Sequence, residues 1–301
     1  MGNLLQNYFH GKPGKRDFTE ADLPANRTAL FFSALRVRWR SMFSLNLLYL
    51  LCWIPAAAWT FINIVQLNYQ LGLQGGILAE GFLGDLLFSY LLVLFPLAAL
   101  TGPFTAGISF VTRNWARDEH SFVWLDFKAA MKANWKQALG VSAISSAVPL
   151  LLLVCTRMYM QMAAQSALFY LPVALVWITA LLWVLSSQLM YMLLISYELS
   201  FVQMVRNAFL MTFAVLPKAM LVRLATGIVP LAMIAAFLFF PAALGWITPA
   251  AICMYGLFWL SLNKMITASY ANAMCEKYLN AQIEGAKMNI GLRPELDEDD
   301  E

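Results

Sequence analysis

Long apolar segments dominate the pattern of hydrophobic and polar positions along the chain. Six mainly apolar runs lie at residues 43–67, 86–111, 138–160, 168–195, 219–244 and 246–270. A helix of about 20 apolar residues is long enough to cross the hydrocarbon core of a bilayer. We therefore predict an all-α fold, a polytopic membrane helical bundle of about six transmembrane helices, with one transmembrane domain over residues 43–270.

Two local features change the expected shape of these runs. The segment Thr101–Gly107 carries Gly102 and Pro103 inside the second run, and proline there predicts a kink in a membrane helix. The fifth and sixth runs meet at Gly245 and Trp246, which predicts a tight helical hairpin.

The basic residues predict the orientation of the bundle. All of the 20 Lys and Arg residues except Arg157 fall on one side of a six-span arrangement. Lys and Arg favour the cytoplasmic face, so we predict a multi-pass protein of a plasma membrane. Its basic N-terminal region (1–42) and its C-terminal tail (271–301) are then both cytoplasmic. Arg157 is expected either to snorkel at the outer interface or to face an inner cavity.

Two segments on the predicted cytoplasmic side resemble each other at an offset of 74 positions. Residues 125–135 place Phe127, Lys132 and Trp135 where residues 199–209 place Phe201, Arg206 and Phe209. In the first segment Phe127, Met131 and Trp135 form an apolar helical stripe beside Lys128, Lys132 and Lys136. This pattern is typical of amphipathic helices in the membrane interface. We therefore predict two cytoplasmic interfacial helices within a parallel repeat of two hairpins, with a chance match as the alternative.

Composition agrees with a membrane protein. Hydrophobic residues make up 61% of the chain and charged residues 12%, against about 45–50% and about 25% in soluble domains. The net charge is +3, and the basic residues lie beside apolar runs instead of forming a separate polar domain. No nucleic-acid partner is therefore expected. Cys52, Cys155, Cys253 and Cys275 form no Cys-x-x-Cys pair, and we expect small core residues rather than a disulfide or a metal site.

Candidate chemistry inside the runs is sparse. No phosphate-binding loop, metalloprotease motif or nucleophile motif occurs, so we expect neither an enzyme nor a bound cofactor or metal. Acidic residues are absent from the apolar interior, which argues against an ion-coupled carrier. A cavity lined by Ser145, Gln188 and Asn263 would favour transport, and tight packing would favour a partner role. Lys264, the deepest cation, is expected either to snorkel or to pair with a glutamate, Glu198 or Glu276.

Several motifs are similar to those of a known family. They are Leu45–Pro55, Gly102–Gly107, Phe110–Arg117 and Asp126–Ala138. The chain resembles the YesL-like bacterial integral membrane proteins, a domain of unknown function, mainly over residues 40–140. In shorter family members the first proline motif runs almost directly into the Gly-Pro motif, whereas residues 56–101 separate them here. The resemblance implies an association with carbohydrate uptake in Gram-positive bacteria, and it supplies no catalytic residues.

Two functions follow as hypotheses. The first is a non-enzymatic accessory protein linked to carbohydrate uptake or envelope processes, embedded in the lipid bilayer beside a sugar-transporter permease or a second copy of the chain. The alternative is a small-molecule transporter or channel in its own right. The positions singled out are Gly102, Pro103, Arg113, Arg117, Phe127, Lys132, Trp135, Phe201, Arg206, Phe209 and Lys264. An outer loop over 68–85 and an acidic tail over 295–301 have no assigned role.

The predicted orientation has a direct test. A reporter fused after Glu301 should be active on the cytoplasmic side, because the basic residues hold that end inside. A reporter that reads as extracellular would contradict the predicted topology.

Overall fold

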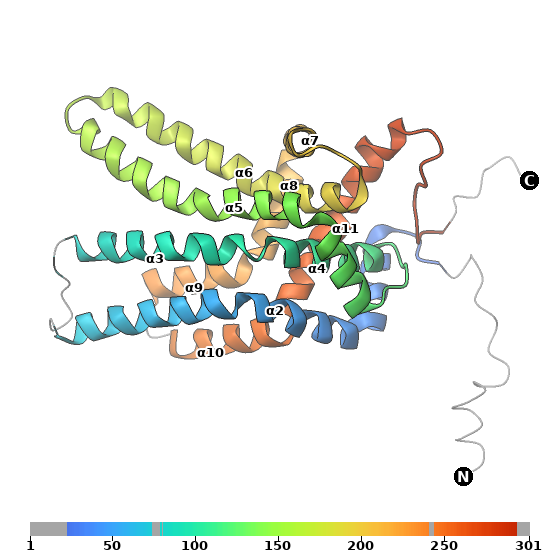
Figure 1. The fold of residues 1–301 in the computed structure, drawn as a ribbon, viewed down its shortest axis with the longest axis horizontal. Helices are drawn as coiled ribbons and strands as arrows, with labels where there is room; N and C mark the ends of the chain where they lie inside the picture. The colour runs from blue at the N-terminus through green and yellow to red at the C-terminus, as the bar shows by residue number, and fades with distance from the viewer. Residues whose placement is uncertain (1–22, 74–78, 80, 241–243, 294–301) are drawn as a thin grey trace, which may run out of the picture.

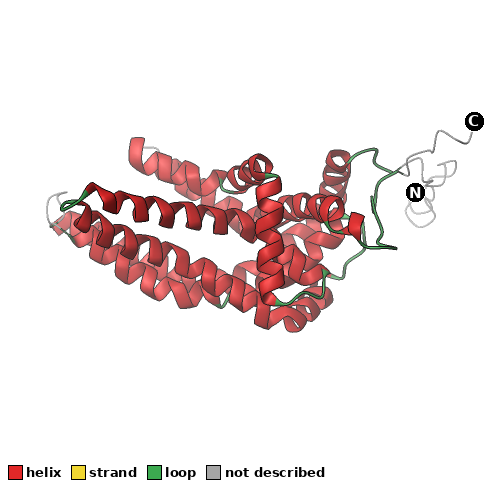
Figure 2. Ribbon diagram, turned by 90° about the horizontal axis from the view of Figure 1, so that it is seen from above, coloured by secondary structure: helices red, strands yellow, loops and turns green. Residues whose placement is uncertain are grey.

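The protein is a helical bundle in which most of the long helices lie roughly along one direction (Figure 1). The computed structural model describes residues 23–73, 79, 81–240 and 244–293, and every regular element in these ranges is helical (Figure 2). The main helices are α2 (Arg27–Leu73), α3 (Phe82–Ala99), α4 (Gly102–Ala116), α5 (Val123–Ala163), α6 (Tyr170–Ser196), α7 (Phe201–Ala214), α8 (Leu216–Thr226), α9 (Ile228–Phe239), α10 (Leu244–Met254) and α11 (Leu260–Tyr278). Short 3-10 turns cover Ala167–Phe169 and Asn280–Gln282, and a π-helical turn covers Tyr255–Trp259.

The predicted all-α membrane bundle is confirmed. Within the described residues, five helices are long and apolar enough to cross a bilayer, and a sixth results if α7 and α8 count as one bent span. The fourth predicted span matches α6 closely. The first is part of a longer helix, because α2 has 47 residues and therefore a length of about 70 Å at 1.5 Å per residue. Residues 1–22, most of the loop 74–80 and the acidic tail from 294 lie outside the described residues.

The prediction of one kinked second span is wrong. Helix α3 ends at Ala99, and α4 begins at Gly102 with proline in its first turn. Proline is favoured at a helix start, since the first amides of a helix need no partner within it. The Gly-Pro motif therefore starts a new helix instead of bending one. Of the 15 residues of α4, eleven are buried, so α4 lies in the core and not against lipid.

The predicted fifth span is also broken. Helices α7 and α8 meet at an angle of 100°, and Gly227 separates α8 from α9. Helix α9 packs against α8 and α10. The predicted hairpin turn is misplaced as well, because Gly245 and Trp246 lie in the first turn of α10. The connecting residues 241–243 are not described.

The two predicted interfacial segments bury equivalent faces, but they differ in how they join the helix that follows. At the offset of 74, the paired positions 127/201, 130/204, 131/205, 134/208 and 138/212 are all buried or partly buried. The first segment is not a separate helix, since α5 continues without a break from Val123 to Ala163. The second segment is a separate helix, α7, with a capping box formed by Ser200 and Gln203.

The predicted apolar stripe is partly wrong. The buried face of α5 passes through Ala130 and Ala138, and Trp135 lies off it with 49% of its surface exposed. The Lys136 ammonium lies 5.7 Å from the ring centre of Trp135, and Lys128 lies 5.9 Å from that of Trp124. Exposed pairs of tryptophan and lysine are typical of the membrane interface, which keeps the predicted location of this segment in the headgroup region.

Helix α4 is held at the centre by close backbone contacts. A side chain at Gly102 would collide with Ser142 and with the backbone of Ala138, and one at Gly107 would lie 2.8 Å from the Phe127 carbonyl oxygen. Two positions in adjacent turns of α4 thus contact α5 at residues 127 and 138–142, so α5 crosses over α4 along much of its first half. The four cysteines are unpaired in this structure. The expectation of small core residues holds for Cys275 and is wrong for Cys253, which is exposed, while Cys52 and Cys155 are partly buried.

A buried asparagine joins the first and last spans. The π-helical turn interrupts the regular hydrogen bonding between α10 and α11. The fully buried Asn46 of α2 donates to the carbonyls of Tyr255 and Gly256 at 2.8 and 3.0 Å and accepts from the amides of Leu260 and Ser261 at 3.0 and 3.2 Å. Its amide therefore replaces the bonds that the turn loses.

Asn46→Leu should lower the free energy of unfolding by about 2 kcal/mol or more, because buried backbone groups would lose their partners. Thermal unfolding of the purified protein in detergent measures this change. Asn63→Leu is the matched control, since the Asn63 amide is also buried in α2 but bonds to Trp59 of its own helix. Equal melting temperatures for the two variants would contradict the role assigned to Asn46.

Candidate functional site

A cavity of about 470 Å³ with a partly polar wall lies inside the bundle, between α2, α3, α4, α5, α6, α8 and α11. This volume falls within the range of small-molecule sites, about 300–1,000 Å³. On α3 the residues that line the cavity are Leu91, Leu94 and Ala98, and on α6 they lie between Trp183 and Met192. The cavity therefore lies in the half of the bundle where α3 and α6 end. On the predicted orientation this is the cytoplasmic half.

Among the described residues, two cations and no acidic residue line this cavity. Lys264 enters it from α11, and its ammonium lies 5.1 Å from the ring centre of Tyr191 on α6. Arg223 enters from α8 and donates to the Val184 carbonyl and, at 3.0 Å, to the Ser187 hydroxyl. Neither cation forms an ion pair within the described part of the chain. The wall of the cavity is therefore positively charged.

Hydroxyl groups supply most of the remaining polarity. Ser145 donates to the Val141 carbonyl at 2.7 Å, Thr105 to that of Thr101 at 3.0 Å, and Thr267 to that of Asn263 at 2.8 Å. Ser142 of α5 donates across to the Ala99 carbonyl at 2.5 Å, next to the break between α3 and α4. Because each proton is directed to a backbone carbonyl, the oxygens act as acceptors: Ser145 accepts from the Trp183 indole at 3.0 Å, and Thr105 pairs with the Tyr49 hydroxyl at 2.7 Å. A hydroxyl oxygen has two lone pairs, so one remains at each of these two residues for a further hydrogen bond.

The sequence predicted some of these residues and missed others. Ser145 and Gln188 line the cavity as the transport hypothesis requires, whereas Asn263 is not among the lining residues. Lys264 neither snorkels out of the bundle nor pairs with a glutamate in the described structure, and it faces the cavity instead. From the sequence, Arg223 is identified only as one of the basic residues on the predicted cytoplasmic side. Its position inside the apolar run 219–244 was the signal that it would be buried.

Two of the predicted arginines hold helix ends together. Arg113 of α4 donates to the Ile195 carbonyl at 3.0 Å and to the Ser196 hydroxyl at 3.2 Å, at the end of α6. Arg117 donates to Asn272 of α11 at 2.7 Å. At the opposite end of the bundle, Arg157 pairs with Asp85 at 3.6 Å, outside the cavity.

The other predicted positions do not gather at one site. Phe127 packs on Gly107, Phe201 on Gly140, and the ring centre of Phe209 lies 6.2 Å from that of Trp183. Lys132 and Arg206 are exposed at equivalent positions of the two similar segments. Gly102 and Pro103 form the start of α4 beside the cavity.

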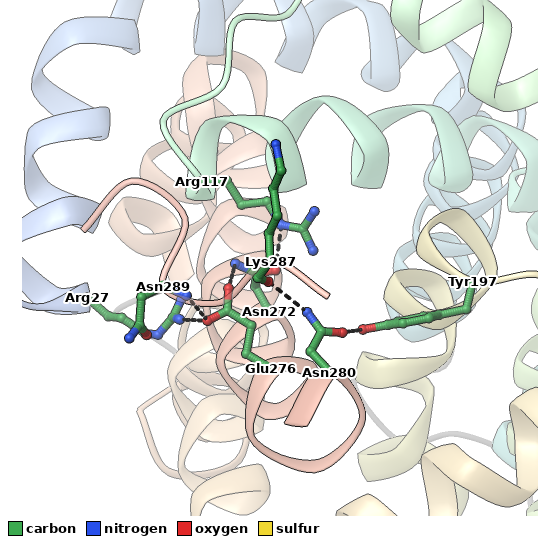
Figure 3. A network of polar contacts seen from close by, with 8 residues as sticks. All are labelled: Arg27, Arg117, Tyr197, Asn272, Glu276, Asn280, Lys287 and Asn289. Carbon is green, nitrogen blue, oxygen red and sulfur yellow. Dashed lines mark hydrogen bonds and ion pairs between the residues drawn. The ribbon is translucent and has the colours of Figure 1, made fainter. Parts of the chain in front are cut away.

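A second polar cluster, the end network, closes the basic end of the bundle (Figure 3). Glu276 of α11 is 2% exposed, and its carboxylate pairs with Arg27 of α2 and accepts from the Asn289 amide at 3.1 Å. Asn272, which binds Arg117, also donates to Glu276 at 3.4 Å. The Arg293 amide donates to the Pro24 carbonyl at 3.1 Å, so the two ends of the described chain lie side by side.

No family model, no curated protein and no solved structure matches this chain. Its function therefore has to be inferred from its own residues.

Arg27→Ala should lower the free energy of unfolding by about 1–3 kcal/mol, because it leaves the buried Glu276 carboxylate without its cation. Thermal unfolding in detergent measures the loss. Arg36→Ala removes an exposed arginine from the same helix and should change the melting temperature little. Were both variants equally stable, the end network would not hold α2 to α11.

Proposed function

We propose that the protein is a membrane transporter that binds a small polar solute in the central cavity. The observation that supports this function is a cavity with a positively charged, partly polar wall inside a bundle of apolar helices. Serine and threonine also serve helix packing in membranes, so the two cations are the stronger part of this argument. Burying cations among membrane helices is costly, and such groups in membrane proteins usually mark a solute or ion pathway.

The cavity favours this function over the accessory role expected first. A protein that acts only as a partner needs an exposed surface and has no use for a polar interior. The association with carbohydrate uptake, a permease partner, a homo-oligomer and membership of the YesL-like family remain predictions, as does location in a bacterial plasma membrane. The proposed transport includes no covalent step, in keeping with the expectation that the protein is not an enzyme.

The helix breaks are consistent with a transport role. Helices α3 and α4 separate at Leu100–Thr101, and Thr101 lines the cavity. Arg223, which also lines the cavity, lies in the last turn of α8, just before the break at Gly227. Discontinuous helices commonly surround the binding sites of transporters, because irregular backbone is tolerated where it borders a polar cavity.

Labelling with a membrane-impermeant maleimide tests whether the cavity is reached by water. In a background without the four native cysteines, Ser145→Cys should react about tenfold faster than Ile144→Cys, because a thiol ionises in water and not in lipid. Ile144 is the matched control, as it is the neighbouring residue of α5, does not line the cavity and is 39% exposed on the bundle surface. The measurement uses permeabilised membrane vesicles, so that both faces meet the reagent.

Equal labelling of the two positions would contradict the proposed function. If Ser145→Cys reacts as expected, solutes that raise the melting temperature of the protein are next followed into proteoliposomes. Flux that depends on the protein would complete the assignment.

A further inference from the structure

The charge and the hydrogen-bonding capacity of the cavity wall identify the class of solute. Among the residues that line the cavity, Lys264 and Arg223 are charged and both are cations. Water cannot solvate them fully inside the bundle, and no carboxylate of the described residues neutralises either one. A solute with a negative charge would be stabilised by both, and a cationic solute would be repelled.

The hydroxyl groups add a second requirement. Ser145, Thr105 and Thr267 each direct their proton to a carbonyl of their own helix. Ser146 and Ser187 do the same, toward Ala143 at 3.1 Å and Val184 at 2.9 Å. Three of these hydroxyl oxygens already have another partner: Ser145 accepts from the Trp183 indole at 3.0 Å, Ser187 from Arg223 at 3.0 Å, and Thr105 pairs with the Tyr49 hydroxyl at 2.7 Å. A hydroxyl oxygen has two lone pairs, so each can still accept one bond from a solute. Acceptors do not favour a carboxylate, which also only accepts, and they favour hydroxyl groups, which donate.

The two cations differ in how firmly they are held. The Arg223 guanidinium is fixed by Val184 and Ser187 of α6, so its position is set by two hydrogen bonds. The Lys264 ammonium lies over the face of the Tyr191 ring, and this contact leaves its three protons for a ligand. Arg223 therefore provides a fixed positive charge, and Lys264 provides an ammonium able to donate to the solute.

We infer that the cavity binds a small organic anion that also carries hydroxyl donors; this inference rests on the proposed function. Lys264 and Arg223 hold the anionic group, and the serine and threonine oxygens accept from the donors. Hydroxy acids and sugar acids share this chemistry. An anion without donors would find a partner only in the two cations, and a neutral polyol would find partners only in the hydroxyl oxygens.

Three six-carbon probes separate these requirements: gluconate has the charge and the hydroxyls, hexanoate the charge alone, and sorbitol the hydroxyls alone. The full chain is purified in an uncharged detergent, and its melting temperature is followed as each probe is titrated. Gluconate should raise the melting temperature in a saturable way at concentrations at least tenfold below those needed for hexanoate or sorbitol. A sorbitol shift equal to that of gluconate would overturn the role of the cations, and an equal hexanoate shift would overturn that of the hydroxyls.

Variants of the two cations give the second arm. Lys264→Met and Arg223→Gln should each raise the gluconate concentration at half-saturation at least tenfold. Lys264→Met should also melt no lower than the parent without solute, because it removes a charge that has no ion-pair partner. Lys218→Gln, which changes an exposed lysine of the same helix as Arg223, is the matched control and should leave gluconate binding unchanged. Unchanged gluconate binding in both cavity variants would refute the inference.

The labelling of Ser145→Cys keeps the two proposals distinct. If the cavity is water-accessible and sorbitol alone binds, the solute is neutral, so transport stands and the anion inference fails. If Ser145→Cys is not labelled, the proposed function fails and the inference fails with it. No saturable shift by gluconate despite efficient labelling would likewise reject the anion while leaving the cavity as a solute path.

Discussion

Backbone polar groups inside a bilayer have to find hydrogen-bond partners within the protein, and this constraint governs where the helices of this bundle break. At the π-helical turn, the Asn46 amide replaces the bonds that the turn loses. At the break between α3 and α4, Ser142 donates to the Ala99 carbonyl, which ends α3. At both places another helix provides the partner that the interruption removes.

The same polar residues give the cavity its character. Ser142 satisfies the carbonyl that ends α3 and also lines the cavity, and Thr101 lies in the same break. Part of the polarity of the cavity wall therefore comes from covering irregular backbone in an apolar medium. Substitutions at these two positions will affect folding together with the proposed binding, whereas Lys264 has no backbone partner among the described residues and its role is the most separable from stability.

The sequence predicted what depends on composition and missed what depends on packing. Apolar run length predicts spans well because the hydrocarbon core has a fixed thickness, and α6 agrees with its run closely. The Gly-Pro motif was misinterpreted, since proline fits both a kink and a helix start, and only the contact of Gly102 with α5 decides between them. Arg223 was missed because charge counting treats every arginine near a span end alike. The partner of Lys264 could not be chosen from sequence, because it depends on the face of α11 that meets α6.

The contacts of α2 with the end of the chain have a consequence for biosynthesis. Arg27 and Asn46 are made early, yet their partners Glu276 and Tyr255 follow more than 200 residues later, so the first span has to be inserted before any of these contacts exists. The Arg27 guanidinium and the Asn46 amide therefore lack these partners until the π-helical turn and α11 have been made. A chain cut off before Tyr255 would leave both groups without the contacts that join α2 to the last helices.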